Sequence, residues 1–382
     1  MNICKSSCLN VYLELIKPYI PSQLISSDNW SNISEIARIL PSAITSFFGF
    51  ECRLGVEEAH ADFLICADAA EAGRKILAGN NYSIELPDFL MAHPVWSNIH
   101  NLGTAWDTDT SPLYDKVRDV WLEFDIEGPP ANIPIPSCFF GPEPIYSTKS
   151  VNPQPHQWVT QTALKLLLNR CLPSQIESQL FNCFDLLPRE AYVFQIGVML
   201  ARKSDLIRIC IRNISSEQII EYLTQLNWPG SISDLKTILA QLSSLVERID
   251  LDLDVGEVIL PKIGLECYLS RQPKLEPRWQ LLLDYLVETG LCIPGKRDAL
   301  DAYPGYIREK TNRELWPTHL LKLSNFLGPQ YERVFFRGLN HIKIVYQLDK
   351  PLEAKAYLSV SHSLLNSQFF RQSRELQENV SV

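Results

Sequence analysis

The sequence has no excess of basic residues. Its 382 residues include 35 lysines and arginines against 44 aspartates and glutamates, which gives a formal net charge of −9 at pH 7. A negative field does not attract phosphate backbones or anionic membranes, so nucleic acid is not an expected partner. The sequence also lacks a basic leader with a long apolar region and any apolar run of membrane-spanning length. It therefore predicts a soluble, cytoplasmic protein that does not use a membrane.

Signatures of cysteine chemistry and of common nucleotide sites are absent too. The ten cysteines form no CxxC pair and no Cys/His cluster with zinc spacing, and several lie inside apolar strand or helix patterns. We expect them to be reduced, small apolar side chains, and we expect no metal site. There is no GxGxxG, no GxxxxGK[ST] and no GxSxG. Without a nucleophile elbow, His60, Asp62 and the serine-rich residues 359–362 do not predict a hydrolase triad.

What the sequence does contain is a repeated order of elements. Hydrophobic residues make up 46% and charged residues 21% of the chain, which is typical of a folded protein with a large core. Short runs that alternate polar and apolar residues come in adjacent pairs, and segments with helical periodicity separate the pairs. The predicted strand pairs are 50–57 with 61–68, 120–127 with 137–142, 191–201 with 205–213, 248–256 with 262–270, and 341–349 with 354–362.

Helical periodicity fills most of the gaps between these pairs. The predicted helices are 33–47, 69–77, 157–171, 173–184, 215–226, 231–246, 279–289 and 318–327, with Ser215 and Ser231 as N-caps. Residues 79–116 and 128–155 are expected to be long loops. The charges of Lys296, Arg297 and residues 308–313 are expected to be solvated. Trp96, Trp106 and Trp121 could stack on a flat substrate, but they are expected mainly in the core.

Five strand pairs with helices between them predict an α+β fold. We expect a helical lead-in over residues 1–32, one domain over residues 33–362 and a polar tail over residues 363–382. The ten strands could form an open sheet with helices on one face, or a closed antiparallel barrel surrounded by helices. Closure is favoured because it removes both exposed edges of the sheet.

The alternation sorts the strand residues into two faces. The apolar face packs against the helices, so the polar face looks into solvent in an open sheet and into the lumen in a barrel. In a lumen, buried charges must be paired, hydrated or bound to a ligand. Charges of both signs lie on this face, namely Arg53, Arg208, Arg212, Lys262, Lys343 and Lys355 against Glu51, Glu123, Asp125, Asp250, Asp252, Asp254 and Glu266.

A row of five such units resembles the aromatic prenyltransferase barrel, the ABBA or PT-barrel fold of the dimethylallyltryptophan synthase group. The resemblance covers residues from about 33 to 362 and depends on element order more than on sequence. Some local residues fit. Glu51, in Gly49-Phe50-Glu51-Cys52-Arg53 on the first strand, is at the place of the family's glutamate that binds an indole N–H. Lys355-Ala356-Tyr357 matches a Lys-x-Tyr pair of the last strand.

The resemblance implies a set of site residues. Glu51 would be the catalytic group that orients the acceptor. Diphosphate would be held by Arg53, Arg208, Arg212, Lys262, Lys343 and Lys355, and the allylic cation would be shielded by Tyr268 and Tyr357. The sequence departs from the family pattern in Glu266-Cys267-Tyr268, where an acid replaces a base, in Cys210, which replaces a tyrosine, and in the absence of an arginine on the second strand.

These residues suit the chemistry of allylic transfer. Ionising an allylic diphosphate requires positive charge at the leaving group and aromatic faces at the cation, and a carboxylate can take the acceptor's proton. There is no DDxxD run. Asp250, Asp252 and Asp254 alternate on one strand, where they could bind Mg²⁺ but are expected to pair with lumen cations or face water. We therefore expect no required cofactor, with Mg²⁺ as an alternative.

The leading hypothesis is a transferase that moves an allylic group, dimethylallyl in the first instance, from its diphosphate to an aromatic small molecule or a peptide-borne acceptor. Two alternatives stay open. The same barrel, or an open sheet, could be a non-catalytic binding or scaffold protein, as its acid-rich polar face favours. The lumen could also hold a cyclase that acts on a substrate without a diphosphate. The sequence does not give the oligomeric state.

Overall fold

A computed structural model describes residues 8–81, 84–147, 155–202, 204–311 and 313–366. Ten of its strands form one closed antiparallel barrel. They are β1 (Phe47–Arg53), β2 (Ala61–Asp68), β3 (Val117–Phe124), β4 (Ser137–Pro142), β5 (Tyr192–Val198), β6 (Ile207–Arg212), β7 (Arg248–Val255), β8 (Ile259–Tyr268), β10 (Tyr331–Tyr346) and β11 (Glu353–Asn366). A further short strand, β9 (Gly305–Arg308), pairs with β10 where β10 extends beyond the barrel.

Two pairings at the chain's C-terminal hairpin decide between an open sheet and a barrel. β10 pairs with β8 on one side and with β11 on the other, and β11 pairs with β1 over seven register positions from Phe47–Ser361 to Arg53–Lys355. The remaining neighbours follow chain order from β1 to β8. The ring is therefore complete, and the predicted closed barrel is confirmed; the open sheet is wrong.

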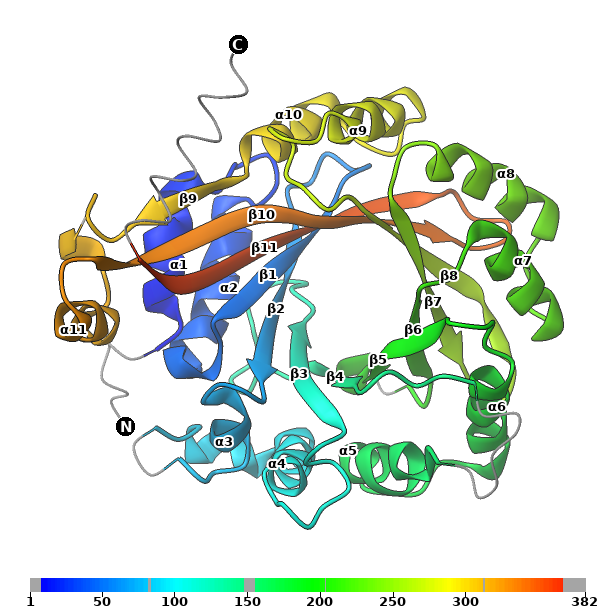
Figure 1. Cartoon of the computed structure of the whole chain (residues 1–382), viewed down its shortest axis with the longest axis horizontal. Coiled ribbons are helices and arrows are strands. Elements are labelled where there is room, and N and C mark those ends of the chain that lie inside the picture. Colours follow the sequence, from blue (N-terminus) through cyan, green and yellow to red (C-terminus); the bar gives the residue numbers. More distant parts are fainter. Residues whose placement is uncertain (1–7, 82–83, 148–154, 203, 312, 367–382) are drawn as a thin grey trace.

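Helices surround the barrel (Figure 1). They are α1 (Asn10–Ile16), α2 (Ser27–Ile39), α3 (Gly73–Leu77), α4 (Pro94–Trp106), α5 (Lys165–Leu168), α6 (Ser174–Asp185), α7 (Ser216–Gln225), α8 (Ile232–Ser243), α9 (Arg278–Glu288), α10 (Pro294–Ala302) and α11 (Thr318–Leu327). A π-helical turn, Val159–Leu164, leads into α5. Single 3₁₀ turns are Lys17–Tyr19, Ser42–Ile44, Asp88–Ala92, Leu200–Arg202 and Arg313–Leu315.

The core is the shell between strands and helices. Strand side chains such as Phe50, Leu122, Ile209 and Leu265 point outward and are fully buried in one continuous apolar cluster with the helices. Trp96 and Trp106 belong to this shell, as expected. The polar partners of the alternation therefore face the barrel interior, which confirms how the sequence sorts the two faces.

Several predicted boundaries are wrong for local reasons. The helix predicted at 33–47 is α2, which starts six residues earlier because the Ser26 side chain accepts from the Asn29 N–H and caps it. The segment 79–116, expected to be a loop, contains α4, whose first turn begins with Pro94. β10 starts ten residues before the predicted strand, and α10 was missed. Ser215 and Ser231 cap α7 and α8 as predicted.

Two predictions about charge and cysteine have clear outcomes. Lys296 is not solvated: its side chain is buried on α10 and its Nζ donates to the carbonyls of Arg53 and Glu58, both at 2.7 Å. A lysine can be buried when backbone oxygens satisfy its ammonium. Apart from Cys8, the cysteines in the described part of the chain are free thiols, and Cys171 alone among them is exposed; Cys4 lies outside the described residues.

The described helices include none that is long and apolar enough to cross a bilayer. The division into a lead-in, one domain and a tail stays a prediction. β11 continues to Asn366, four residues past the predicted end of the last strand, and most of the predicted tail lies outside the described residues.

Candidate functional site

The described part of the barrel lumen contains two adjoining pockets that differ chemically, the ionic half and the aromatic half. The ionic half is lined by six carboxylates and five cations, namely Glu51, Asp62, Glu123, Asp125, Asp252 and Asp254 with Arg202, Arg208, Lys262, Lys343 and Lys355. The aromatic half is lined by rings that include Phe47, Trp121, Phe139, Phe194, Tyr268, His341 and Tyr357. Leu64, Glu123, Arg208, Asp252 and Lys343 line both halves, so the two are adjacent.

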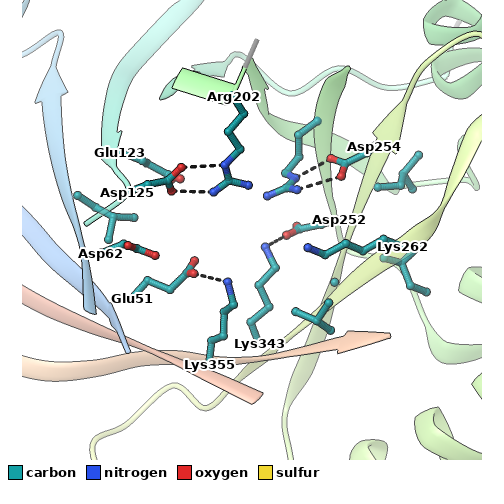
Figure 2. Close-up of a pocket in the computed structure, with 16 residues that line it drawn as sticks. Glu51, Asp62, Glu123, Asp125, Arg202, Asp252, Asp254, Lys262, Lys343 and Lys355 are labelled. Atoms are coloured by element: carbon teal, nitrogen blue, oxygen red, sulfur yellow. Dashed lines mark hydrogen bonds and ion pairs between the residues drawn. The ribbon is translucent and has the colours of Figure 1, made fainter. Parts of the chain in front are cut away.

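The two halves differ in free space. The ionic half holds about 50 Å³, enough for a few water molecules, because its charged side chains meet across the lumen (Figure 2). The aromatic half holds about 330 Å³. This larger space leaves room for an organic ligand.

Strand register places opposite charges next to each other in the ionic half. Arg208 on β6 faces Asp254 on β7 in the register, and its guanidinium donates to both carboxylate oxygens at 2.8 and 3.0 Å. Lys343 on β10 contacts Asp252. At the mouth, Arg202 donates to Asp125 at 2.8 and 2.7 Å. These bonds satisfy most of the charge that the lumen contains.

Each of the three alternating aspartates of β7 forms an ion pair with a lysine or arginine. Asp250 accepts from Arg212 and from Arg248, both at 2.9 Å. Asp252 and Asp254 pair with Lys343 and Arg208. The expectation that these aspartates pair with cations is confirmed. Among the described residues no group of three or more His, Cys, Asp or Glu side chains could hold a metal ion.

Lys262 is the exception among the lumen cations. Within the described part of the chain it makes no ion pair or hydrogen bond, although it lines the ionic half and is only half-buried. Burial lowers the pKa of Lys262, and the charges of Arg208 and Lys355 lower it further. Lys262 is therefore the cation most readily available to an incoming anion.

Glu51 lies at the floor of the ionic half with both oxygens bonded. Lys355 Nζ donates to Oε1 at 2.5 Å, and the Tyr357 hydroxyl donates to Oε2. Burial opposes its ionisation, but the charges of Lys355 and Lys343 and these two bonds outweigh burial and lower the Glu51 pKa to about 2. Glu51 is a stable carboxylate whose partners are the Lys-x-Tyr pair of β11.

Glu123 contrasts with Glu51. It lines both halves, and in the described part of the chain it has no hydrogen-bond or ion-pair partner. Burial raises its pKa to about 8, and the negative charge of Glu51 contributes to this rise. Figure 2 shows its side chain on the lumen side of β3 beside Asp125.

The aromatic half is organised around a stack of three rings. His341 lies between Tyr357, with ring centroids 4.1 Å apart, and Tyr268, at 4.7 Å. Glu266 accepts from the Tyr268 hydroxyl at 2.8 Å and lies 3.5 Å from His341 Nε2. The guanidinium of Arg212 lies 3.9 Å from the Phe194 ring centroid. Faces of π-systems next to cations suit a positively charged or flat aromatic ligand.

Most of the residues predicted for the site do meet in the lumen. Those that line it are Glu51, Arg208, Arg212, Lys262, Tyr268, Lys343, Lys355 and Tyr357. Arg53 does not line either half: it shares a face with Glu51 but lies at the end of β1 with an exposed side chain. Their roles toward substrate stay predictions.

Sequence reasoning missed several lumen residues. Arg202 follows β5 in a 3₁₀ turn, outside any alternation, so no local pattern places it at the mouth. Phe139, Phe194 and Gln195 line the aromatic half from β4 and β5. The alternation around Phe139 was available as a signal, but β5 contains a bulge between Val193 and Gln195 that shifts its faces. Trp121, one of the three tryptophans considered, also lines this half.

The weak hydrolase signal has no counterpart in the described structure. His60 Nε2 lies 3.6 Å from Asp62 Oδ1, and this aspartate accepts from the Ile126 N–H at 2.9 Å. Ser359 donates instead to the Gly338 carbonyl at 3.1 Å. The serine, histidine and aspartate do not form a relay.

No family model matches the sequence, and no curated protein matches it. Solved structures do match. The chain is 10% identical to prenyltransferase PriB in its ternary complex with L-tryptophan and dimethylallyl thiolodiphosphate, with a TM-score of 0.47 over 92% of this chain and 93% of that chain. It is 11% identical to the NotF prenyltransferase, with a TM-score of 0.49 over 94% and 92% of the two chains. It is 11% identical to AnaPT from Neosartorya fischeri, with a TM-score of 0.44 over 95% and 93%.

These similarities span nearly the whole chain at low identity and with TM-scores below 0.5. The architecture therefore rests on the strand order and register of this protein, in which ten antiparallel strands close into a barrel inside a ring of helices. Prenyltransferases are among the solved structures that match, and they are the family that the order of elements in this sequence resembles.

Proposed function

We propose that the lumen transfers an allylic group, dimethylallyl in the first instance, from its diphosphate to an aromatic acceptor. The observation that carries this proposal is the adjacency of the two halves: cations that suit a diphosphate open directly into a ring-lined space of about 330 Å³. The leaving group and the cation it leaves behind need these two environments side by side.

The residues divide the work as follows. Lys262, Lys355 and Arg208 would bind the diphosphate, with Arg212 and Lys343 as further positive charge near the aromatic half. As the allylic C–O bond breaks, the diphosphate leaves with the electron pair, and the faces of Tyr268, Tyr357 and Trp121 would shield the cation. Glu51 would orient an N–H or O–H of the acceptor once Lys355 turns toward the phosphate.

The donor must compete with carboxylates that already hold these cations. Arg208, Lys343 and Lys355 each have an acidic partner in the lumen. Binding of a diphosphate would exchange these partners, and a divalent cation bound to the diphosphate would offset the surplus of negative charge. We propose no resident cofactor, and we expect Mg²⁺ to strengthen donor binding.

The same charge balance favours a second candidate function. Because nearly every described lumen cation is already paired, the lumen would suit a neutral or zwitterionic aromatic ligand without any exchange of partners. The protein would then be a binding protein, or a cyclase acting on a substrate without a diphosphate.

Calorimetry with dimethylallyl thiodiphosphate, which resists hydrolysis, separates the two candidates. Prenyl transfer predicts micromolar binding that Mg²⁺ tightens and that Lys262→Met weakens by about 10- to 100-fold, since one charge-assisted contact is worth roughly 1.5–3 kcal/mol. Arg208→Ala and Lys355→Ala should also lower turnover strongly while the protein stays folded. The matched control is Arg297→Ala, which removes an Arg–Asp pair from the outer helices. The absence of heat at millimolar ligand would exclude the donor and favour the second candidate.

A further inference from the structure

Glu123 occupies the junction of the lumen. Five residues line both halves, and three of them, Arg208, Asp252 and Lys343, are engaged in ion pairs. Leu64 is apolar. Glu123 is thus the one titratable group at the junction that has no partner in the described part of the chain. A carboxyl without a partner, placed between a cation cluster and a ring-lined space, lowers the stability of the folded protein. Such a group is a candidate for a role in the reaction.

Each of the other described carboxylates of the lumen has at least one partner. Glu51, Asp125, Asp252 and Asp254 are ion-paired, Asp62 accepts from the Ile126 N–H, and Glu266 accepts from the Tyr268 hydroxyl. Asp119 at the far end of β3 accepts from the Gly141 backbone N–H. A carboxylate that accepts bonds from donors is a weaker base. Asp252 keeps Oδ1 without a hydrogen bond, but its other oxygen contacts the Lys343 ammonium. Among the described residues, neither oxygen of Glu123 has a partner.

We propose that Glu123 is the general base that takes the proton released by the acceptor during allylic transfer. This inference rests on the proposed function and adds to it a residue that the resemblance does not supply. Glu51, bound to Lys355 and Tyr357, is left with the task of orienting the acceptor.

The step balances without a co-reactant. The allylic C–O bond breaks and the diphosphate keeps its electron pair. The acceptor forms a bond to the allylic carbon, and the electrons of its C–H, N–H or O–H bond return to the acceptor while the proton moves to a Glu123 oxygen. The proton then leaves to solvent when the products do.

The surroundings of Glu123 set its proton affinity. Its register neighbours, Leu64 and Ser137, carry no charge. Asp125, two residues further along the chain, and Asp62, on the neighbouring strand β2, are the charged groups closest to it in the chain and the sheet. The other charged and titratable groups that line the cavity around it are Glu51, Arg202, Arg208, Asp252, Lys343, Lys355 and Tyr357. Burial is the largest cause of the raised pKa, about 8, and Glu51 adds to it while Lys343 and Arg208 oppose it. A base with this pKa is well matched to work near neutral pH.

The experiment is a pH–rate profile of dimethylallyl transfer to indole and to phenol as probe acceptors. For the wild type, kcat should rise about tenfold between pH 7 and pH 9, with a midpoint near the pKa of Glu123. Glu123→Gln should lower kcat about 100-fold or more and abolish this rise, while the Kd for dimethylallyl thiodiphosphate changes by less than about threefold. Glu127→Gln, an exposed glutamate on the same segment, is the matched control and should behave as wild type.

Glu51→Gln gives a second, directional test. Because the charge of Glu51 raises the pKa of Glu123, its removal should move the midpoint of the rising limb to lower pH without abolishing the limb. If Glu123 had only a structural role, Glu51→Gln would not shift the midpoint of this rising limb.

The outcomes separate this inference from the proposed function. Wild-type kcat, or a retained rising limb, in Glu123→Gln overturns the base and leaves prenyl transfer standing. No donor binding and no product in the wild type overturns the transfer and the base together.

If the donor binds but neither acceptor reacts, the pH dependence of thermal stability tests the proposed base instead. Between pH 5 and pH 8 the wild type should lose a few degrees of Tm relative to Glu123→Gln, because a raised carboxyl pKa makes the folded state lose stability as pH rises through that window. An equal slope would overturn the base.

Discussion

The two halves of the lumen are built from the same strands and yet differ in what they leave unoccupied. In the ionic half, charges of opposite sign meet and fill the space, which leaves about 50 Å³. In the aromatic half, rings line the wall and about 330 Å³ stays open. In the ionic half the charged side chains bind one another, whereas the aromatic half has room to bind a ligand. Charge alone thus does not identify the part of a lumen that has room for a ligand.

The largest expected loss of stability comes from removing one member of a buried ion pair in the ionic half. Lys343→Met leaves Asp252 and Glu266, both buried, without their shared cation. We expect a loss of about 3–5 kcal/mol in the free energy of unfolding, measured by urea denaturation. Arg189→Met, which removes an exposed ion pair, should change it by less than about 1 kcal/mol. A small effect of Lys343→Met would mean that water reaches this pair.

The aromatic half should be most sensitive to a change of its wall. A Cβ at Gly197 on β5 would lie 1.9 Å from Cδ1 of Phe139, so Gly197→Ala must displace that ring. We expect a loss of about 1–3 kcal/mol in unfolding free energy and weaker binding of aromatic ligands. Gly128→Ala is the control, since a Cβ there meets nothing within 4 Å. Unchanged ligand binding in Gly197→Ala would show that Phe139 is not part of the functional wall.

Acid should act on the ionic half through Glu51. Its folded-state pKa, about 2, lies below the ordinary value of 4.5, so the unfolded state binds more protons between these values. The stability that Glu51 contributes is present above about pH 4.5 and is lost as pH falls toward 2. Relative to Glu51→Gln, the wild type should lose about 2 kcal/mol between pH 6 and pH 3, measured by urea denaturation at each pH. Parallel pH curves for the two proteins would contradict the bonded carboxylate.

The smallest expected effect is at the boundary of the aromatic half. Tyr268→Phe removes the hydroxyl that donates to Glu266 but keeps the ring that packs on His341. We expect a loss of about 1 kcal/mol in unfolding free energy and nearly unchanged binding of an aromatic ligand. Tyr268→Leu should instead weaken that binding, because it removes the ring. If the Phe and Leu variants bound the aromatic ligand equally well, the Tyr268 ring would have no role in ligand binding.

Local patterns were sufficient to predict much of the fold. Alternation placed Arg208, Asp252 and Lys343 on the inner face and Ile209, Leu253 and Ile344 on the outer face, because side chains in a strand alternate with a period of two whatever the neighbouring strand is. The alternation does not continue through the β5 bulge, where one extra residue shifts the faces. It also failed to find the outer half of β10, where residues 331–340 continue past the barrel.

The candidate site was harder to predict than the fold. The sequence supplied Glu51, Lys355 and Tyr357 by their place on the first and last strands, which pair with each other only in the closed barrel. It gave no reason to choose Glu123 from the acids of the lumen, because Glu123 differs from them only in having no partner among the described residues, and pairing depends on the tertiary structure. Arg202 was unpredictable, since it follows a strand end and reaches Asp125 from 77 positions away.

The sequence by itself determined the five strand pairs, the helices between most of them and the face on which each strand carries its charges, since these depend on neighbours within one element. The tertiary structure decided the rest. Closure of β11 onto β1 turned a polar face into a lumen, and register chose which acid meets which base. That choice left Lys262 and Glu123 without partners among the residues that the structure describes, because burial and pairing depend on residues that are distant in the chain and adjacent only in the folded barrel.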